Sequence, residues 1–149
     1  CASINARLHL IHPLGFSLDE KSFKRAGMDY FLDCEIIEYN SIEEFYQNHP
    51  NQEIFYITRY AKKVYSDEDY SLPTKEYYFM FGKESTGIPY DILKNHLEHC
   101  LRIPMQRNAR SLNLSNCVAI VSYEACRQQD FFLLATEETF KGADFLLKE

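Results

Sequence analysis

The sequence predicts an α/β fold with a largely parallel sheet flanked by helices. Residues 54–58 (IFYIT) and 77–81 (YYFMF) are continuous apolar runs, which are typical of strands buried on both faces. A later segment has the spacing of one helix face, at Leu114, Val118, Val121 and Ala125. Because strand-like and helix-like segments alternate along the chain, the sheet should be mostly parallel and covered on both sides.

The first 50 residues should contain one strand and two capped helices. Residues 7–12 (RLHLIH) alternate apolar and polar side chains before a proline, which predicts a strand. Two capping boxes, each a serine followed three residues later by a glutamate, predict helix starts. They are Ser17 with Glu20, whose helix should end at Gly27, and Ser41 with Glu44, whose helix should cover 42–47 and end at Pro50.

The second half adds the remaining elements. Pro89 suits a first helical turn and predicts a helix over 90–96. Residues 100–103 form a shorter apolar run and should be a strand. The helical spacing near the end of the chain predicts a longer helix over 113–127.

Length and composition fit a single domain over residues 1–149. A chain of 149 residues with 46% hydrophobic content can bury one core. Residues 1–5 (CASIN) have the character of a helix tail that leads straight into a strand. We therefore expect roughly 20 residues upstream, a first strand and most of a first helix, which this sequence lacks. No apolar run approaches the ~20 residues of a membrane span, so we expect no membrane partner.

The charge distribution excludes a generally basic nucleic-acid coat, because the net charge is −6. Positive charge is local and could line a basic groove on an acidic protein. Its clusters are Lys21, Lys24 and Arg25; Lys62 and Lys63; and Arg102, Arg107 and Arg110. Such clusters are also common on solvated faces, so both interpretations stay open.

Cysteine usage indicates a reducing compartment. The five cysteines are an odd number without paired spacing, which favours free thiols and a cytoplasmic location. The one cue to a metal is the proximity of His96, His99 and Cys100. Since the sequence has no second cluster of potential metal ligands to complete a site, we expect no metal.

Two segments carry the candidate chemistry, residues 81–89 (FGKESTGIP) and 102–125 (RIPMQRNARSLNLSNCVAIVSYEA). Each opens at the end of a predicted strand, where open α/β sheets bind ligands. Gly82 would let a flat ligand approach the backbone, and Glu84 supplies a carboxylate at the same edge. The first segment could equally be a plain strand, turn and helix start, and it lacks the pattern of a phosphate loop.

The second segment passes from a strand through a polar loop into the long helix. Arg107 and Arg110 lie in that loop, and Ser111 and Asn113 stand at the helix entrance, where free backbone N–H groups gather. Helix capping is the alternative explanation for the short polar residues Ser111, Asn113, Ser115 and Asn116.

The residues FGKESTGIP, RIPM and SLNLSNCVAIVSYEA resemble, in order and spacing, the second and third motifs of the SPOUT class of RNA 2′-O-methyltransferases. The combination of SLNLSN, a valine and YEA is most similar to the small tRNA (cytidine(34)-2′-O)-methyltransferase subgroup. HPLGF and KRAGMDY upstream also resemble that subgroup. The resemblance runs from about residue 8 to residue 127.

This resemblance implies a C-terminal deep trefoil knot, a feature that periodicity does not predict because knots are rare. It implies S-adenosylmethionine as cofactor and a homodimer as the working unit. The positions that match cofactor-binding residues of the family are Ile57, Gly82, Ile103, Ser111 and Leu112.

The implied activity is methyl transfer to the ribose 2′-hydroxyl of the wobble nucleotide, a cytidine or modified uridine at position 34 of tRNA. Ser111 and Asn113 are expected to shape the catalytic site. Glu84 is expected to orient a family arginine that would lie upstream of Cys1. That arginine would act by hydrogen bonding and charge, since it is always protonated. RNA would contact Lys24, Arg25, Arg107 and Arg110.

Two other functions stay open on the sequence. The first is 2′-O-methylation of another tRNA position or of ribosomal RNA at the same cofactor site. The second is a noncatalytic RNA-binding dimer with the same fold. Two segments depart from the family pattern: residues 62–70 form a charged, tyrosine-rich loop whose register does not follow from the motifs, and residues 131–149 are longer than expected after the last helix. We expect the latter segment to form a short helix packed on the dimer.

Overall fold

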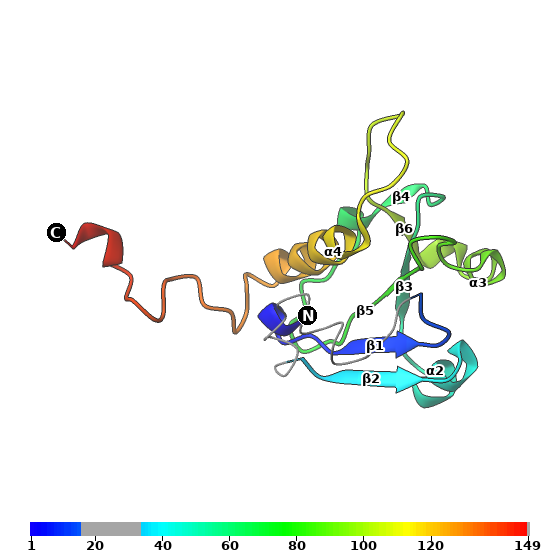
Figure 1. Ribbon diagram of the computed structural model, residues 1–149, viewed down its shortest axis with the longest axis horizontal. Helices are drawn as coiled ribbons and strands as arrows, with labels where there is room; N and C mark the ends of the chain where they lie inside the picture. The colour runs from blue at the N-terminus through cyan, green and yellow to red at the C-terminus, as the bar shows by residue number, and fades with distance from the viewer. Residues whose placement is uncertain (16–33, 149) are drawn as a thin grey trace.

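The structure, a computed structural model, describes residues 1–15 and 34–148 (Figure 1). The strands are β1 (Leu8–Ile11), β2 (Ile36–Tyr39), β3 (Ile54–Ile57), β4 (Lys63–Val64), β5 (Tyr78–Phe81) and β6 (Cys100–Arg102). The α-helices are α2 (Ile42–Asn48), α3 (Tyr90–Lys94) and α4 (Leu114–Gln128). Short 3-10 helices are η1 (Ala2–Ile4), η3 (Tyr65–Asp67), η4 (Leu97–His99) and η5 (Phe145–Leu147).

All strand ladders among the described residues are parallel, which confirms the predicted α/β fold. Four strands form one sheet in the order β4-β6-β3-β5, and β1 pairs with β2 as a separate two-stranded unit. β3 is central, with Ile57 opposite Phe81 on one side and Leu101 on the other. The carboxyl ends of β3, β5 and β6 therefore meet at one edge of the sheet.

Helices cover both faces of this sheet, and β3 contributes to two apolar clusters. Ile54 and Tyr56 pack in a cluster with Phe45 of α2 and Leu93 of α3. Phe55, the residue between them, packs in a second cluster that includes Ala125 of α4. This alternation explains why the run at 54–58 is continuously apolar: both of its faces are buried.

Helix caps follow the sequence closely. The Ser41 hydroxyl accepts a hydrogen bond from the Glu44 N–H at 3.3 Å, as the capping box predicts. The Glu44 carboxylate accepts from the Asn40 N–H at 2.6 Å, one residue before the expected partner. The predicted stripe of α4 faces inward, with Val121 and Ala125 buried.

Several elements differ from the expectations. β2 was not predicted, because the acidic Glu38 interrupts its apolar run; that carboxylate lies 2.9 Å from His12 Nε2, beyond the end of neighbouring β1. The helix predicted over 90–96 ends at Lys94, and η4 follows after a turn at residues 95–96, where His96 leaves the helical conformation with φ −139°. The helix predicted from Ser17 to Gly27 lies outside the described residues.

The chain beyond α4 extends away from the body, as Figure 1 shows in orange and red. It contains η5 near its end, and Phe140 is 98% exposed. No helix within residues 1–15 and 34–148 is both long and apolar enough to cross a membrane. All five cysteines are free thiols.

Candidate active site

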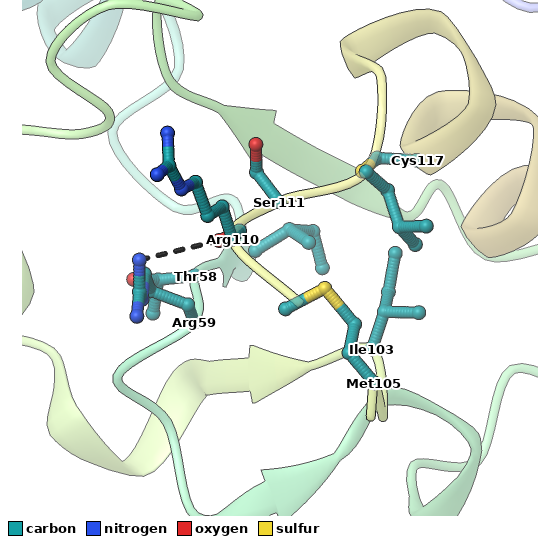
Figure 2. A pocket seen from close by; sticks show the side chains of 9 residues that line it. Thr58, Arg59, Ile103, Met105, Arg110, Ser111 and Cys117 are labelled. Atoms are coloured by element: carbon teal, nitrogen blue, oxygen red, sulfur yellow. Dashed lines mark hydrogen bonds between the residues drawn. The ribbon is translucent and has the colours of Figure 1, made fainter. Parts of the chain in front are cut away.

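A pocket of about 110 Å³ lies at the carboxyl ends of β3 and β6 (Figure 2). These strands are adjacent and in register, and the Thr58 N–H donates to the Leu101 carbonyl at 2.9 Å. Nine residues from the two strand ends, the following loop and α4 line it: Ile57, Thr58, Arg59, Ile103, Met105, Arg110, Ser111, Leu112 and Cys117. The sheet topology thus brings together residues from positions 57 to 117.

Four of the five predicted cofactor residues meet at this pocket, namely Ile57, Ile103, Ser111 and Leu112. Their roles remain predictions. The register of β3 and β6 places Ile57 beside the strand that leads to Ile103, and the chain after β6 returns Ser111 and Leu112 to the same pocket. Gly82, the fifth, does not line the pocket.

Gly82 has a structural requirement of its own. A Cβ atom at this position would lie 2.1 Å from the Gly87 carbonyl carbon and 2.2 Å from the Ile88 nitrogen. Gly87 has φ 72° and donates its N–H to the Lys83 carbonyl at 2.8 Å, which closes a tight turn over β5's end. The backbone that approaches Gly82 in this structure is therefore the chain's own turn.

Two arginine side chains connect the loop after β3 to β6 and to the loop between β6 and α4. Arg59 donates from Nη1 to the Arg110 carbonyl at 3.2 Å, the dashed line in Figure 2. Arg102 donates from Nη1 to the Arg59 carbonyl at 2.7 Å. These contacts connect the loop after β3 to the loop that carries Ser111, so the two sides of the pocket are fixed to each other.

Asn113 is the N-cap of α4. Its side-chain oxygen accepts from the backbone N–H groups of Ser115 at 2.9 Å and Asn116 at 3.4 Å, and from the Ser115 hydroxyl. Capping, the alternative that the sequence left open, is thus what this oxygen does. A contact of Asn113 with a ribose stays a prediction.

Of the other predicted site residues that the structure describes, only Arg110 lines the pocket. Glu84 and Arg107 are exposed and do not line it, whereas Arg110 does. Lys24 and Arg25, the other residues expected to contact RNA, lie outside the described residues. Glu84 stands in the turn closed by Gly87, beside the end of β5.

The pocket wall includes four residues that the sequence interpretation missed: Thr58, Arg59, Met105 and Cys117. Thr58 and Arg59 follow a buried strand directly, and polar residues at that place are a usable signal for a ligand site. Burial raises the pKa of the Cys117 thiol, so it lines the pocket as a neutral, weakly polar group. Met105 and Cys117 lie inside the quoted motifs RIPM and SLNLSNCV, and that position is the signal that could have identified them.

Residues that had suggested a metal make other contacts. His96 Nδ1 lies 2.8 Å from the Ile92 carbonyl, and the Cys100 thiol donates to the His96 carbonyl at 3.3 Å. Within the part of the chain that the structure describes, no group of three or more potential ligands gathers.

A parallel sheet with a pocket at the carboxyl ends of adjacent strands is the arrangement in which open α/β proteins bind their ligands. The model of the SpoU rRNA Methylase family matches residues 1–123. This chain therefore belongs to the SpoU methylase family.

Individual relatives agree with this assignment. A Listeria monocytogenes serotype 4b (strain F2365) protein is 51% identical over 140 residues, or 94% of this chain and 83% of that protein, and is named provisionally a tRNA (cytidine(34)-2′-O)-methyltransferase. A crystal structure from Bacillus anthracis, provisionally an RNA methyltransferase, is 50% identical with a TM-score of 0.87, covering 93% of this chain and 87% of that one. A structure reported for the 2-OH methylation of C/U34 on tRNA is 32% identical, with a TM-score of 0.76 and coverage of 87% and 83%.

Proposed function

We propose that this protein transfers the methyl group of S-adenosylmethionine to the ribose 2′-hydroxyl of the wobble nucleotide of tRNA, a cytidine or modified uridine at position 34. The observation that carries the proposal is the pocket, where Ile57, at the end of β3, meets three motif residues of a SpoU methylase, Ile103, Ser111 and Leu112. The choice of position 34 is supported by the name of the Listeria relative, at 51% identity, and by the report on the C/U34 structure, at 32% identity.

The lining suits this cofactor chemically. Ile57, Ile103 and Leu112 provide apolar walls for a flat purine ring, and the Ser111 hydroxyl provides a polar contact. The pocket's volume of about 110 Å³ is below the ~300 Å³ at which small-molecule sites begin, so in this conformation it encloses only part of such a ligand. When bound, S-adenosylmethionine supplies an activated methyl group on a sulfonium.

The chain's own residues would position and activate the hydroxyl. A 2′-hydroxyl is a poor nucleophile until its proton is hydrogen-bonded or removed during attack. Ser111 lines the pocket, and Asn113 starts α4, so we assign both to shaping the ribose site. The exposed Glu84 can accept paired hydrogen bonds from a guanidinium, which fits its expected role of orienting an arginine.

We also propose that the segment from β6 into α4 forms a deep trefoil knot. The contact of Arg59 with the Arg110 carbonyl brings the loop after β3 against the loop before α4. After that loop, α4 packs against β5 and η3. Both contacts are compatible with a threaded chain.

A homodimer is our proposal for the working unit. Leu146 and Leu147 are 90% and 81% exposed at the end of an extended tail, and apolar surface of this kind favours association. Sedimentation velocity of the full-length protein tests this proposal.

A tRNA substrate and free cysteines support a cytoplasmic location.

RNA binding would use local positive charge on an acidic protein. Arg110 lines the pocket, and Arg107 lies in the same exposed loop. Guanidinium groups there can contact phosphates, which gives affinity without sequence information. Lys24 and Arg25 are assigned to the same role on the family resemblance.

The decisive experiment maps ribose methylation in tRNA and ribosomal RNA from cells with and without the gene. We expect methylation at position 34 of a subset of tRNAs to disappear in the deletion strain and to return with a plasmid copy. Purified protein with labelled S-adenosylmethionine should methylate the same unmodified tRNA. Intact methylation at position 34 in the deletion strain would overturn the proposal.

The same map tests the second candidate, methylation of another tRNA position or of ribosomal RNA, which the description of the matching family favours. Loss of a mark at such a site in the deletion strain would select this candidate. If no ribose mark changes, the noncatalytic RNA-binding dimer becomes the better explanation.

A further inference from the structure

Two tyrosines form an exposed pair beside the pocket. Tyr60 and Tyr90 are 62% and 57% exposed, yet their hydroxyl oxygens lie 3.1 Å apart. Their rings meet edge to face, with centroids 5.5 Å apart and planes at 76°. Large rings that contact each other while facing solvent present a preformed aromatic surface.

The pair spans two of the strand ends that position the site. The Tyr60 N–H donates to the Thr58 hydroxyl at 3.3 Å, and Thr58 lines the pocket. Tyr90 begins α3, immediately after the turn that follows β5. The tyrosine pair therefore connects the loop after β3 to the segment after β5, at the same edge of the sheet as the pocket.

Positive charge accompanies the tyrosine pair. The Arg59 guanidinium carbon lies 5.8 Å from the centroid of the Tyr60 ring, within cation–π range. Arg59 and Arg110 line the adjacent pocket, and Arg102 binds the Arg59 carbonyl. None of the ion pairs found among the described residues involves these three arginines, so a local positive patch stands on a protein of net charge −6.

Aromatic rings combined with guanidinium groups bind unpaired nucleic-acid bases. Bases of single-stranded loops stack on tyrosine and on the planes of arginine side chains, while the charge holds the backbone. A partner protein would be an alternative occupant for exposed rings. The neighbouring arginines favour a nucleic acid instead, because its phosphates complement their positive charge while its bases can stack on the rings.

We propose that Tyr60, Tyr90 and Arg59 form a stacking surface for an unpaired nucleobase of the RNA substrate, next to the reacting nucleotide. This inference rests on the proposed function and adds positioning residues to it. A base held there would fix the register of the single-stranded loop, so that one ribose is presented to the pocket. Methyl transfer itself would not involve the tyrosines.

The test compares Tyr60→Ala and Tyr90→Ala with Tyr60→Phe and Tyr90→Phe in the full-length protein, using the unmodified tRNA that the wild type methylates. Removing a ring should raise the Kd for tRNA about five- to a hundredfold, the range for loss of one base–aromatic stack. KM for tRNA should rise similarly, with kcat nearly unchanged at saturating tRNA. The phenylalanine variants keep the ring and should bind within about twofold of the wild type.

Arg7→Ala is the matched control for Arg59→Ala. Arg7 lies just before the amino end of β1, whereas the pocket lies at the carboxyl ends of β3 and β6, and Arg7 pairs with Glu35 and Glu76. Both changes remove one positive charge, but only Arg59→Ala should weaken tRNA binding severalfold. Calorimetry with S-adenosylmethionine should give the same affinity for the tyrosine variants and the wild type, and circular dichroism should give the same melting curve.

Three outcomes decide the inference. Loss of tRNA affinity in the alanine variants with rescue by phenylalanine supports it. Unchanged Kd and KM would overturn it, while methylation of position 34 by the wild type would leave the proposed function intact. A change of oligomeric state in Tyr60→Ala, seen by sedimentation, would also overturn it by assigning the tyrosine pair to a contact between copies.

Discussion

The side chain of Gln128 accepts a hydrogen bond from the backbone N–H of Tyr70 at 2.7 Å, across 58 positions of sequence. The same amide donates to the Glu68 carbonyl at 3.0 Å. Tyr70 is fully buried, and its hydroxyl donates to the Tyr65 carbonyl at 2.8 Å. The last turn of α4 thus holds the segment that follows β4 in place, while Cys117, in the first turn of the same helix, lines the pocket.

Gln128→Ala should therefore destabilise the fold. The change leaves the Tyr70 N–H and the Glu68 carbonyl without these partners in a partly buried place, at a cost of about 1–3 kcal/mol. Urea unfolding followed by circular dichroism should show a lower midpoint with an unchanged slope. Gln106→Ala, in the exposed loop, is the control, and an equal midpoint for both variants would contradict this role of Gln128.

This contact also shows where prediction from sequence ends. β3 and α4 could be predicted because their apolar patterns are local, and the edge that β3 shares with β6 followed from parallel strands. A pairing between Gln128 and Tyr70 depends on how the chain returns across the sheet, which no local pattern encodes. For the same reason, the conformation of residues 62–70 could not be predicted from the sequence.

The candidate site was predictable to a similar extent. Ile103, Ser111 and Leu112 were identified by family motifs and Ile57 by its place at the end of a strand, and all four line one pocket. Physical reasoning alone would have located strand ends but not the residues that matter there. For Gly82, the motif identified the position, while the structure supplies a reason that the sequence could not, a close approach by Gly87 and Ile88.

Gly82→Ala tests this steric requirement. A Cβ 2.1 Å from the Gly87 carbonyl carbon forces the turn to shift, which should cost about 1–3 kcal/mol, as overpacking typically does. Affinity for S-adenosylmethionine should also fall if the displaced turn belongs to its site. Gly15→Ala is the matched control, since among the described residues nothing beyond its own chain neighbours lies within 4 Å of its Cβ position. Equal melting temperatures for the two variants would refute the prediction.

Substitutions of Asn113 separate capping from catalysis. Asn113→Ala removes the acceptor for two backbone N–H groups of α4 and should lower the free energy of unfolding by about 1 kcal/mol. Asn113→Asp keeps an oxygen cap but lacks the amide N–H₂ donor, so stability should recover. If methylation also recovers in Asn113→Asp, the residue acts through the helix alone; persistent loss of kcat would support a contact with the ribose.

Ser111→Ala should weaken cofactor binding without affecting stability. The Ser111 side chain is exposed and lines the pocket, so its removal costs the fold little. Loss of one hydrogen bond to S-adenosylmethionine, worth about 1 kcal/mol, should raise the Kd about fivefold in calorimetry. Ser66→Ala, an exposed serine in η3, is the control. An unchanged Kd in Ser111→Ala would remove this residue from the cofactor site.

Stability should decrease as the pH falls below neutrality, because of His9. Its Nδ1 lies 3.0 Å from the hydroxyl of the buried Tyr39, whose oxygen is also 3.0 Å from His49 Nε2. Burial lowers the pKa of His9, with smaller contributions in the same direction from His49 and Arg7 that outweigh Glu35 and Glu76.

The sign follows from proton binding. In the unfolded chain His9 takes up its proton near pH 6.5, whereas the folded protein binds it only at lower pH. The unfolded state then holds more protons, so the free energy of unfolding falls as the pH drops below about 6.5 and is fully retained above it. His9→Phe should be less stable at pH 7.5 but show a flatter dependence between pH 7.5 and 5.5 in urea titrations. Because burial is the main cause of the pKa shift, adding about 0.5 M salt should leave the pH dependence of the wild-type protein in place. A pH dependence that disappears in salt, or that persists in His9→Phe, would assign the effect to other charged groups.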